Sequence, residues 1–144
     1  MAQKSVLYNI FNDLSTAMKT IVSSKYIFLK NRPKITESDS PMSKFVVIDL
    51  PVSIDDYVIG GKKTLLNTTG VFYLFTQARK NGTLDIGSSG DLVDEVESLF
   101  PIKGEYVNAV NPSVSLRGSD EQGFQVSAIT FDLQSKWKVF NKNQ

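Results

Sequence analysis

The stretch at 70–101 constrains the fold more than any other part of the chain. Its first residues, GVFYLFTQAR (70–79), alternate between two faces of a strand, both of them apolar. Turn-forming residues follow, including the single Asn-Gly pair at Asn81-Gly82. Residues 88–100 then repeat apolar positions at helical spacing until Pro101. The stretch predicts a sheet strand followed by a short amphipathic helix that covers the sheet.

A second helical pattern lies at the N-terminus. Residues 4–24 carry one apolar stripe with spacings of three and four, made of Val6, Leu7, Ile10, Phe11, Leu14, Met18, Ile21 and Val22. Such a stripe predicts a helix packed on a sheet. Further strands are predicted at 25–30, at 44–51, at 102–116 with a break at Asn111-Pro112, and at 124–140, with a turn at Gly60-Gly61.

The order of these elements predicts the fold class. A helix, three or four strands, a second helix and two or three strands do not alternate one for one. This order favours an α+β fold, a mainly antiparallel sheet with an N-terminal helix and a second short helix packed on it. We expect a single domain over 1–144, with loops near 31–43 and 52–69 and a frayed C-terminal tail.

The strand expected at 44–51 (KFVVIDLP) is apolar on both faces. Two arrangements explain such a strand. It is either central in its sheet, or covered by a neighbouring subunit in an oligomer.

Composition narrows the classes of function. The 144 residues include no histidine and no cysteine, which excludes disulfides, thiolate nucleophiles and Cys or His metal ligands. It also removes the side chain that most often acts as general base. The formal net charge is +1, without the basic footprint of nucleic-acid binding. We therefore expect a non-enzymatic protein with no cofactor, no sequence-specific nucleic-acid binding, and no signal peptide or membrane segment.

One glycine-rich turn, IGSSGD (86–91), precedes a predicted helix. A phosphate-binding loop of this kind usually carries a lysine after its second glycine, where this chain has Asp91. Ser88 or Ser89 is instead interpreted as the helix cap. The carboxylates Asp91, Asp94, Glu95 and Glu97 are interpreted as a solvated outer face. No catalytic, cofactor-binding or metal-binding residue is predicted.

Two features remain as candidate contacts with a partner. Basic residues follow the strand at 25–30 and the Gly60-Gly61 turn, and aromatic residues lie near the C-terminus. Basic clusters are commonly solvated surface and C-terminal aromatics commonly belong to a core, but both types also occur in interfaces. The candidate interface residues are Lys30, Arg32, Lys34, Lys62, Lys63, Trp137 and Phe140.

The segments KFVVIDLP, GVFYLFTQAR and DLVDEVESLF, in this order after an N-terminal helix, carry a resemblance. The chain resembles the small tail-terminator and tail-completion proteins of tailed bacteriophages, which lie at the neck between head and tail. The resemblance implies a structural virion protein, present in the host cytoplasm during assembly. It implies a homo-oligomeric ring, most often hexameric, that caps the tail or connects it to the head. The implied partners are other copies of the chain and other neck or tail proteins.

Two other classes remain open. One is a small-molecule-binding domain or a histidine-free enzyme that uses Asp and Ser side chains. The other is an adaptor subunit of a contractile or secretion machine. A pocket with convergent Asp, Ser and Lys side chains would favour the first of these classes. The second class shares much of the logic of the ring-forming protein.

Overall fold

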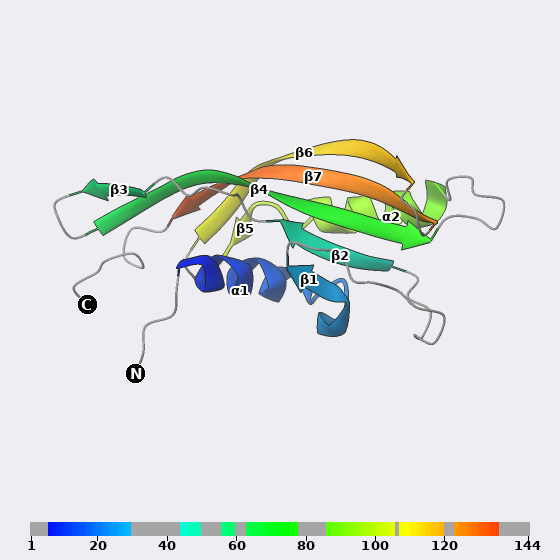
Figure 1. Cartoon of the computed structure of the whole chain (residues 1–144), viewed down its shortest axis with the longest axis horizontal. Helices are drawn as coiled ribbons and strands as arrows, with labels where there is room; N and C mark the ends of the chain where they lie inside the picture. The colour runs from blue at the N-terminus through cyan, green and yellow to red at the C-terminus, as the bar shows by residue number, and fades with distance from the viewer. Residues whose placement is uncertain are drawn as a thin grey trace.

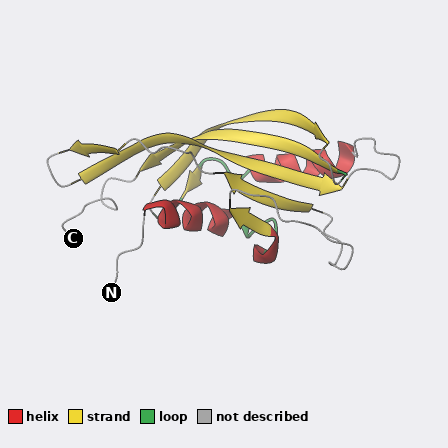
Figure 2. Cartoon of the chain, viewed as in Figure 1, coloured by secondary structure: helices red, strands yellow, loops and turns green. Residues whose placement is uncertain are grey.

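A curled sheet and two α-helices make up the described part of the chain (Figures 1 and 2). The computed structural model describes residues 6–29, 44–49, 56–59, 63–77, 86–105, 107–119 and 123–135. Its helices are α1 (Val6–Met18), the 3-10 turn η1 (Ser24–Tyr26) and α2 (Ile86–Glu97). Its strands are β1 (Ile27–Leu29), β2 (Lys44–Asp49), β3 (Asp56–Ile59), β4 (Lys63–Gln77), β5 (Ile102–Lys103), β6 (Val107–Ser119) and β7 (Phe124–Ser135).

The strand order is β1-β2-β4-β7-β6-β5, and β3 pairs with the first part of β4. All the described strand pairs are antiparallel except β1 with β2. The strands arch over the two helices, with the β6–β7 pair and β4 forming the long part of the sheet (Figure 1). The predicted α+β class, with an N-terminal helix and a second short helix on a mainly antiparallel sheet, is confirmed.

The main core lies between the sheet and the two helices. Helix α1 contributes Ile10, Leu14 and Met18, all with no exposed surface. The sheet contributes the alternate residues that face the helices, among them Val46, Ile48, Phe72, Leu74, Ile129, Phe131 and Leu133. Helix α2 contacts β4 and β7 and buries Leu92 and Val96. The predicted helix that covers the sheet is therefore present.

Three aromatic rings meet in this core. The Phe72 ring lies 4.6 Å from Phe131 and 6.0 Å from Phe100, and the Phe100 and Phe131 rings are 5.4 Å apart, centroid to centroid. Gly70 pairs with Phe131 across β4 and β7. A Cβ atom at Gly70 would lie 2.9 Å from two atoms of the Phe131 ring. The absence of a side chain at Gly70 therefore makes room for the Phe131 ring.

The opposite face of the sheet carries a smaller core. The Phe45 and Phe75 rings stack with centroids 4.4 Å apart, and Phe124 meets Phe45 edge-on at 5.1 Å. Phe45, Val46, Val47 and Ile48 of β2 are all buried within the single chain. Of the two arrangements expected for this strand, the central position between β1 and β4 is therefore the one observed. Its burial needs no neighbouring subunit.

A buried carboxylate connects α1 to the far end of the sheet. The Val107 backbone N–H donates a hydrogen bond of 2.9 Å to Oδ2 of Asp13, which is 6% exposed. A Cβ atom at Gly104 would lie 2.5 Å from Asp13 Cγ, so only glycine leaves room for this carboxylate. Helix α1 also contacts β1 and β2. The helix thus spans the curl from the β1 edge to the start of β6.

Both helices differ from their expected bounds. The helix expected over 4–24 ends at Met18, because the chain turns with Ile21 N–H and Val22 N–H both donating to the Met18 carbonyl. Helix α2 begins at Ile86, so Ser88 and Ser89 lie inside its first turn and the predicted cap is wrong. Ser89 is instead buried, with its Oγ 3.4 Å from Ser127 Oγ of β7.

Two strand segments also differ from expectation. The segment 52–69, predicted as a loop, contains β3 and the start of β4, paired as a hairpin on either side of the predicted Gly60-Gly61 turn. The break expected at Asn111-Pro112 is a bulge within one continuous strand, because β6 stays paired with β7 on both sides of it. The expected loop at 31–43, the Asn81-Gly82 turn and the C-terminal tail lie outside the described residues.

Replacing Gly70 with alanine should lower the free energy of unfolding by about 1–3 kcal/mol, the usual range for overpacking a close-packed core. The Phe131 ring, held by Phe72 and Phe100, has little room to withdraw. Gly90 in α2 is the matched control, because a Cβ there meets nothing within 4 Å. Gly90→Ala should raise stability by about 0.5–1 kcal/mol through helix propensity. Urea denaturation of both variants measures the two free energies of unfolding. An equal change in Gly70→Ala and Gly90→Ala would contradict the described packing.

Replacing Asp13 with alanine should lower the free energy of unfolding by about 1–3 kcal/mol, because the Val107 N–H loses its buried acceptor. Asp13→Asn should lose less, since the amide oxygen still accepts a hydrogen bond. Asp94→Ala, on the exposed face of α2, is the control and should change stability by no more than about 0.5 kcal/mol. Thermal unfolding gives the comparison, and an Asp13→Ala variant as stable as Asp94→Ala would contradict it.

Candidate functional site

The predicted interface residues lie mostly outside the described part of the chain. Lys30, Arg32, Lys34, Lys62, Trp137 and Phe140 fall among residues that the structure does not describe. Lys63 is the first residue of β4, where its backbone pairs with Ile59 of β3. The role of these residues in an interface therefore stays a prediction.

Among the described residues, the outer side of β6 is a strand edge without a neighbouring strand along most of its length. Strand β5 pairs with β6 only at Asn108 and Ala109. From Asn111 onward, no other described strand pairs with the outer side of β6. This part of β6 lies along the outer border of the sheet in Figure 1. Its backbone N–H and C=O groups on that side form a row that another strand can pair with.

Two bulges limit this free edge. The pairing of β6 with β7 shifts between Val110 and Ser113 and again between Leu116 and Gly118. Asn111 has a φ of 59° at the first bulge and Gly118 a φ of 86° at the second. The regular ladder between them covers 113–116. The part of the edge that can accept a partner strand in regular pairing is therefore short.

Apolar side chains stand exposed on this short run. Val114 and Leu116 lie opposite Ile129 and Ser127 of β7, so they point to the same face of the sheet as the helices. Helix α2 covers β4 and β7 but leaves Leu116 65% exposed and Val114 38% exposed. We call these two residues, with the outer edge of 113–117, the β6 edge site. Exposed apolar side chains beside unpaired backbone groups are typical of an association surface.

Helix α2 adds an apolar residue on the side of this site. Ser88, Asp91 and Glu95 form the flank of α2 that lines a hollow with Lys44 of β2. At 3.6 residues per turn, Ile86 and Val93 fall on the opposite flank, which faces β6 because β6 lies beyond β7 in the strand order. Ile86 is 62% exposed. The apolar surface of the β6 edge site therefore continues toward the start of α2.

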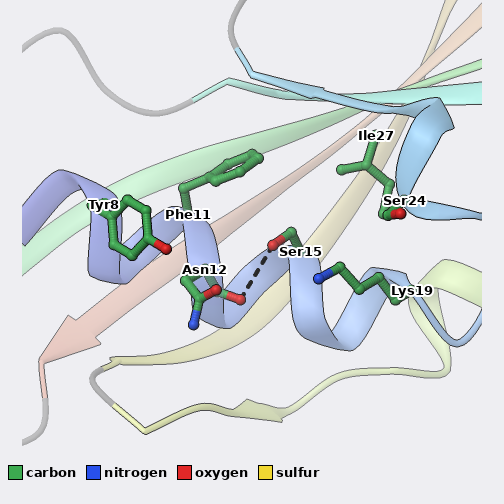
Figure 3. Close-up of a pocket in the computed structure, with 7 residues that line it drawn as sticks. All are labelled: Tyr8, Phe11, Asn12, Ser15, Lys19, Ser24 and Ile27. Atoms are coloured by element: carbon green, nitrogen blue, oxygen red, sulfur yellow. Dashed lines mark hydrogen bonds between the residues drawn. The ribbon is translucent and has the colours of Figure 1, made fainter.

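One hollow in the described part of the chain is a groove beside α1 (Figure 3). Its volume is about 230 Å³, and its lining residues are Tyr8, Phe11, Asn12, Ser15, Lys19, Ser24 and Ile27. The Ser15 hydroxyl donates to the Asn12 carbonyl at 3.2 Å, so it is directed along the helix. Lys19 supplies the one charge among these seven residues. The groove offers apolar contact and one cation, and no acid–base pair.

The second hollow lies between α2 and the ends of β2 and β4. It measures about 250 Å³ and is lined by Lys44, Thr76, Ser88, Asp91, Leu92 and Glu95. Thr76 Oγ1 is buried without a protein hydrogen-bond partner. The carboxylates of Asp91 and Glu95, four residues apart on one helix face, stand with the single cation of Lys44. A hollow lined by two carboxylates and one cation is poorly suited to a phosphate group.

Within the described ranges, no group of three or more Asp or Glu side chains is placed to hold a metal ion. Neither helix of the described part is long and apolar enough to cross a membrane. No protein-family model matches the chain, and no curated protein matches its sequence.

Sequence reasoning missed the β6 edge site. Its signal was present: Val114 and Leu116 alternate with Ser113 and Ser115 directly after Pro112, a residue that is common at strand edges. Alternation of this kind marks a strand with one apolar face. It does not tell whether a neighbouring strand covers that strand's edge.

Replacing Asn111 with valine should lower the free energy of unfolding by about 1–2 kcal/mol, because a β-branched residue is strained at positive φ. Asn111→Gly keeps the conformation without strain and should be nearly neutral. Asn111 Nδ2 also donates a hydrogen bond to Asp132 Oδ2 at 3.0 Å. Asp132→Ala removes this hydrogen bond and leaves the backbone at 111 unchanged, so it measures the contribution of the hydrogen bond alone. Urea midpoints give the comparison. Equal losses for Asn111→Val and Asn111→Gly would contradict a role for the backbone conformation.

Proposed function

We propose that this protein is a structural assembly subunit of the head–tail neck of a tailed bacteriophage, forming a ring that terminates the tail or joins it to the head. The observation that carries the proposal is the β6 edge site. It combines a strand edge that no other described strand pairs with and the exposed side chains of Val114 and Leu116. Such an edge is suited to binding another protein chain.

The order of elements supports the same class. An N-terminal helix, a central strand at β2, the long strand β4, the covering helix α2 and the closing β6–β7 pair follow one another along the chain. This is the order on which the resemblance to tail-terminator and tail-completion proteins depends. The proposed partners are other copies of the chain, in a hexamer or a multiple of it, and neighbouring neck or tail proteins.

The small volume of the two described hollows favours a protein that binds its partners through its surface over one that binds a small molecule. Both described hollows, about 230 and 250 Å³, fall below the roughly 300–1,000 Å³ that ligand pockets usually occupy. The groove beside α1 also lacks a carboxylate among its lining residues. The proposed mechanism is therefore assembly, without a cofactor or a chemical step. The proposed location is the virion, with the host cytoplasm during assembly.

The same edge also suits an adaptor subunit of a contractile or secretion machine. Such an adaptor would bind a tube protein and would not need to associate with itself. Self-association of the purified chain therefore distinguishes the two candidates.

The proposal predicts that the purified chain forms a closed oligomer. Native mass spectrometry should give one discrete species, a hexamer or a multiple of it, and negative-stain electron microscopy should show rings. A chain that remains monomeric alone and in the presence of a tube protein would contradict the proposal. A monomer that assembles only on a tube would favour the adaptor.

The predicted basic contacts are tested by charge reversal. Lys62→Glu with Lys63→Glu, and Arg32→Glu with Lys34→Glu, should weaken assembly if these residues face a partner, because like charges then oppose one another across the contact. Lys103→Glu, at an exposed position on β5, is the control and should assemble normally. Assembly that is unchanged in both double variants would remove these residues from the interface.

A further inference from the structure

The outer edge of β6 selects an extended chain as its partner. Between its two bulges, the edge presents backbone donors and acceptors at strand spacing, and this pattern is matched by another strand. The run is short, and Pro112 before it has no N–H to donate. The edge therefore discriminates among partner strands mainly by the side chains that would stand opposite 113–117.

The run at 113–117 can be paired with the same run of a second copy in several registers. When two copies pair antiparallel around a two-fold axis perpendicular to the sheet, opposite residues lie on the same face and one residue faces its own copy. Centring the axis on Val114 puts Leu116 opposite Pro112. Centring it on Leu116 puts Val114 opposite Gly118, in the second bulge. Centring it on Ser115 puts Val114 opposite Leu116 of the second copy, and does so twice.

The Ser115 register also separates the charges. Arg117 is the only charged residue in the run from 111 to 119. In this register Arg117 faces Ser113 of the second copy. The two arginines then stand four residues apart along the strands, about 13 Å, beyond the Debye length of about 8 Å at physiological salt. In the Leu116 register they would lie about half as far apart and repel.

Burial favours the same arrangement. In the Ser115 register, Val114 and Leu116 of both copies form one apolar cluster on the helix side of the joined sheet. Ile86 stands at the side of this cluster, at the exposed start of α2. The exposed apolar area of each copy is then covered by the equivalent area of the other. On the face that carries Ser115, serine meets serine at the centre, and Arg117 of each copy meets Ser113 of the other on either side.

We propose that a second copy of this chain is the occupant of the β6 edge site, paired antiparallel with Ser115 opposite Ser115 of the second copy. The proposal rests on the self-assembly given above as the function, and it names the contact. A two-fold contact closes on itself. A ring with a head side and a tail side has no such axis between neighbouring subunits, so the β6 contact pairs two chains or two rings, and a second, different contact elsewhere on the chain closes each ring.

The absence of cysteine from the sequence makes a direct test possible. In the proposed register, the two Ser115 Cα atoms lie about 4.5–5.5 Å apart, within the range that a disulfide spans. Under mild oxidation, Ser115→Cys should form a covalent dimer on the order of a hundredfold faster than Ser113→Cys, because pairing raises the local concentration of the facing thiol. Ser113 is the matched control, as it is also exposed but lies about 13 Å from its own copy in this register.

A second variant tests the apolar contact. Leu116→Lys should weaken self-association about tenfold or more, since it places an ammonium group against Val114 of the second copy. Its melting temperature at low concentration should stay unchanged, because Leu116 is already 65% exposed in one copy. Leu29→Lys, at an exposed position on the opposite sheet edge, is the control and should associate normally.

The outcomes separate this proposal from the proposed function. Rapid cross-linking of Ser115→Cys together with weakened association of Leu116→Lys supports the β6 contact. An oligomer that persists in Leu116→Lys, with Ser115→Cys no faster than Ser113→Cys, overturns the β6 contact and leaves self-assembly standing. Cross-linked dimers from a chain that forms no ring keep the contact and overturn the ring. A wild-type chain that stays monomeric alone overturns the β6 contact, and one that also stays monomeric in the presence of a tube protein overturns the proposed function as well.

Discussion

Aromatic packing on both faces of β4 is the constraint on which the rest of the structure depends. Phe72 packs toward the helices against Phe100 and Phe131, and Phe75 packs on the other face against Phe45. Each buried phenylalanine contributes about 1.5–3 kcal/mol. Strand β4 is paired along both edges, with β2 and β3 on one side and β7 on the other. Both hydrophobic clusters therefore share one strand, and a disturbance of β4 reaches both of them.

Helix α1 determines how far the sheet can curl. It contacts β1 and β2 near one edge and holds the Val107 amide through Asp13 near the other. This fixes the end of the sheet at which β5 and β6 begin. The later part of β6 extends beyond the cover of the helices, so its edge and its apolar residues stay exposed. The same curl that closes the core thus leaves one strand edge available for association.

The sequence predicted the parts of the fold that local patterns encode. Alternation in GVFYLFTQAR predicted the two faces of β4, and helical spacing predicted an apolar side for α2, on which Leu92 and Val96 are buried. The errors lie where contacts distant in sequence decide the outcome. Ser89 has the residue type of a helix cap, yet it faces Ser127 of β7. No local pattern places Asp13 in the interior, yet it is buried and accepts a hydrogen bond from Val107. The free edge of β6 depends on the strand order, which no local pattern records.

The two bulges in β6 affect solubility as well as shape. A long, flat and apolar strand edge promotes stacking of chain upon chain into fibrils. Fibril-forming segments typically need about six or seven residues in regular extended pairing. The positive φ angles of Asn111 and Gly118 interrupt the ladder on either side of 113–116, which is shorter than that. The edge can therefore accept one short partner strand, while the bulges oppose the growth of aggregates from it.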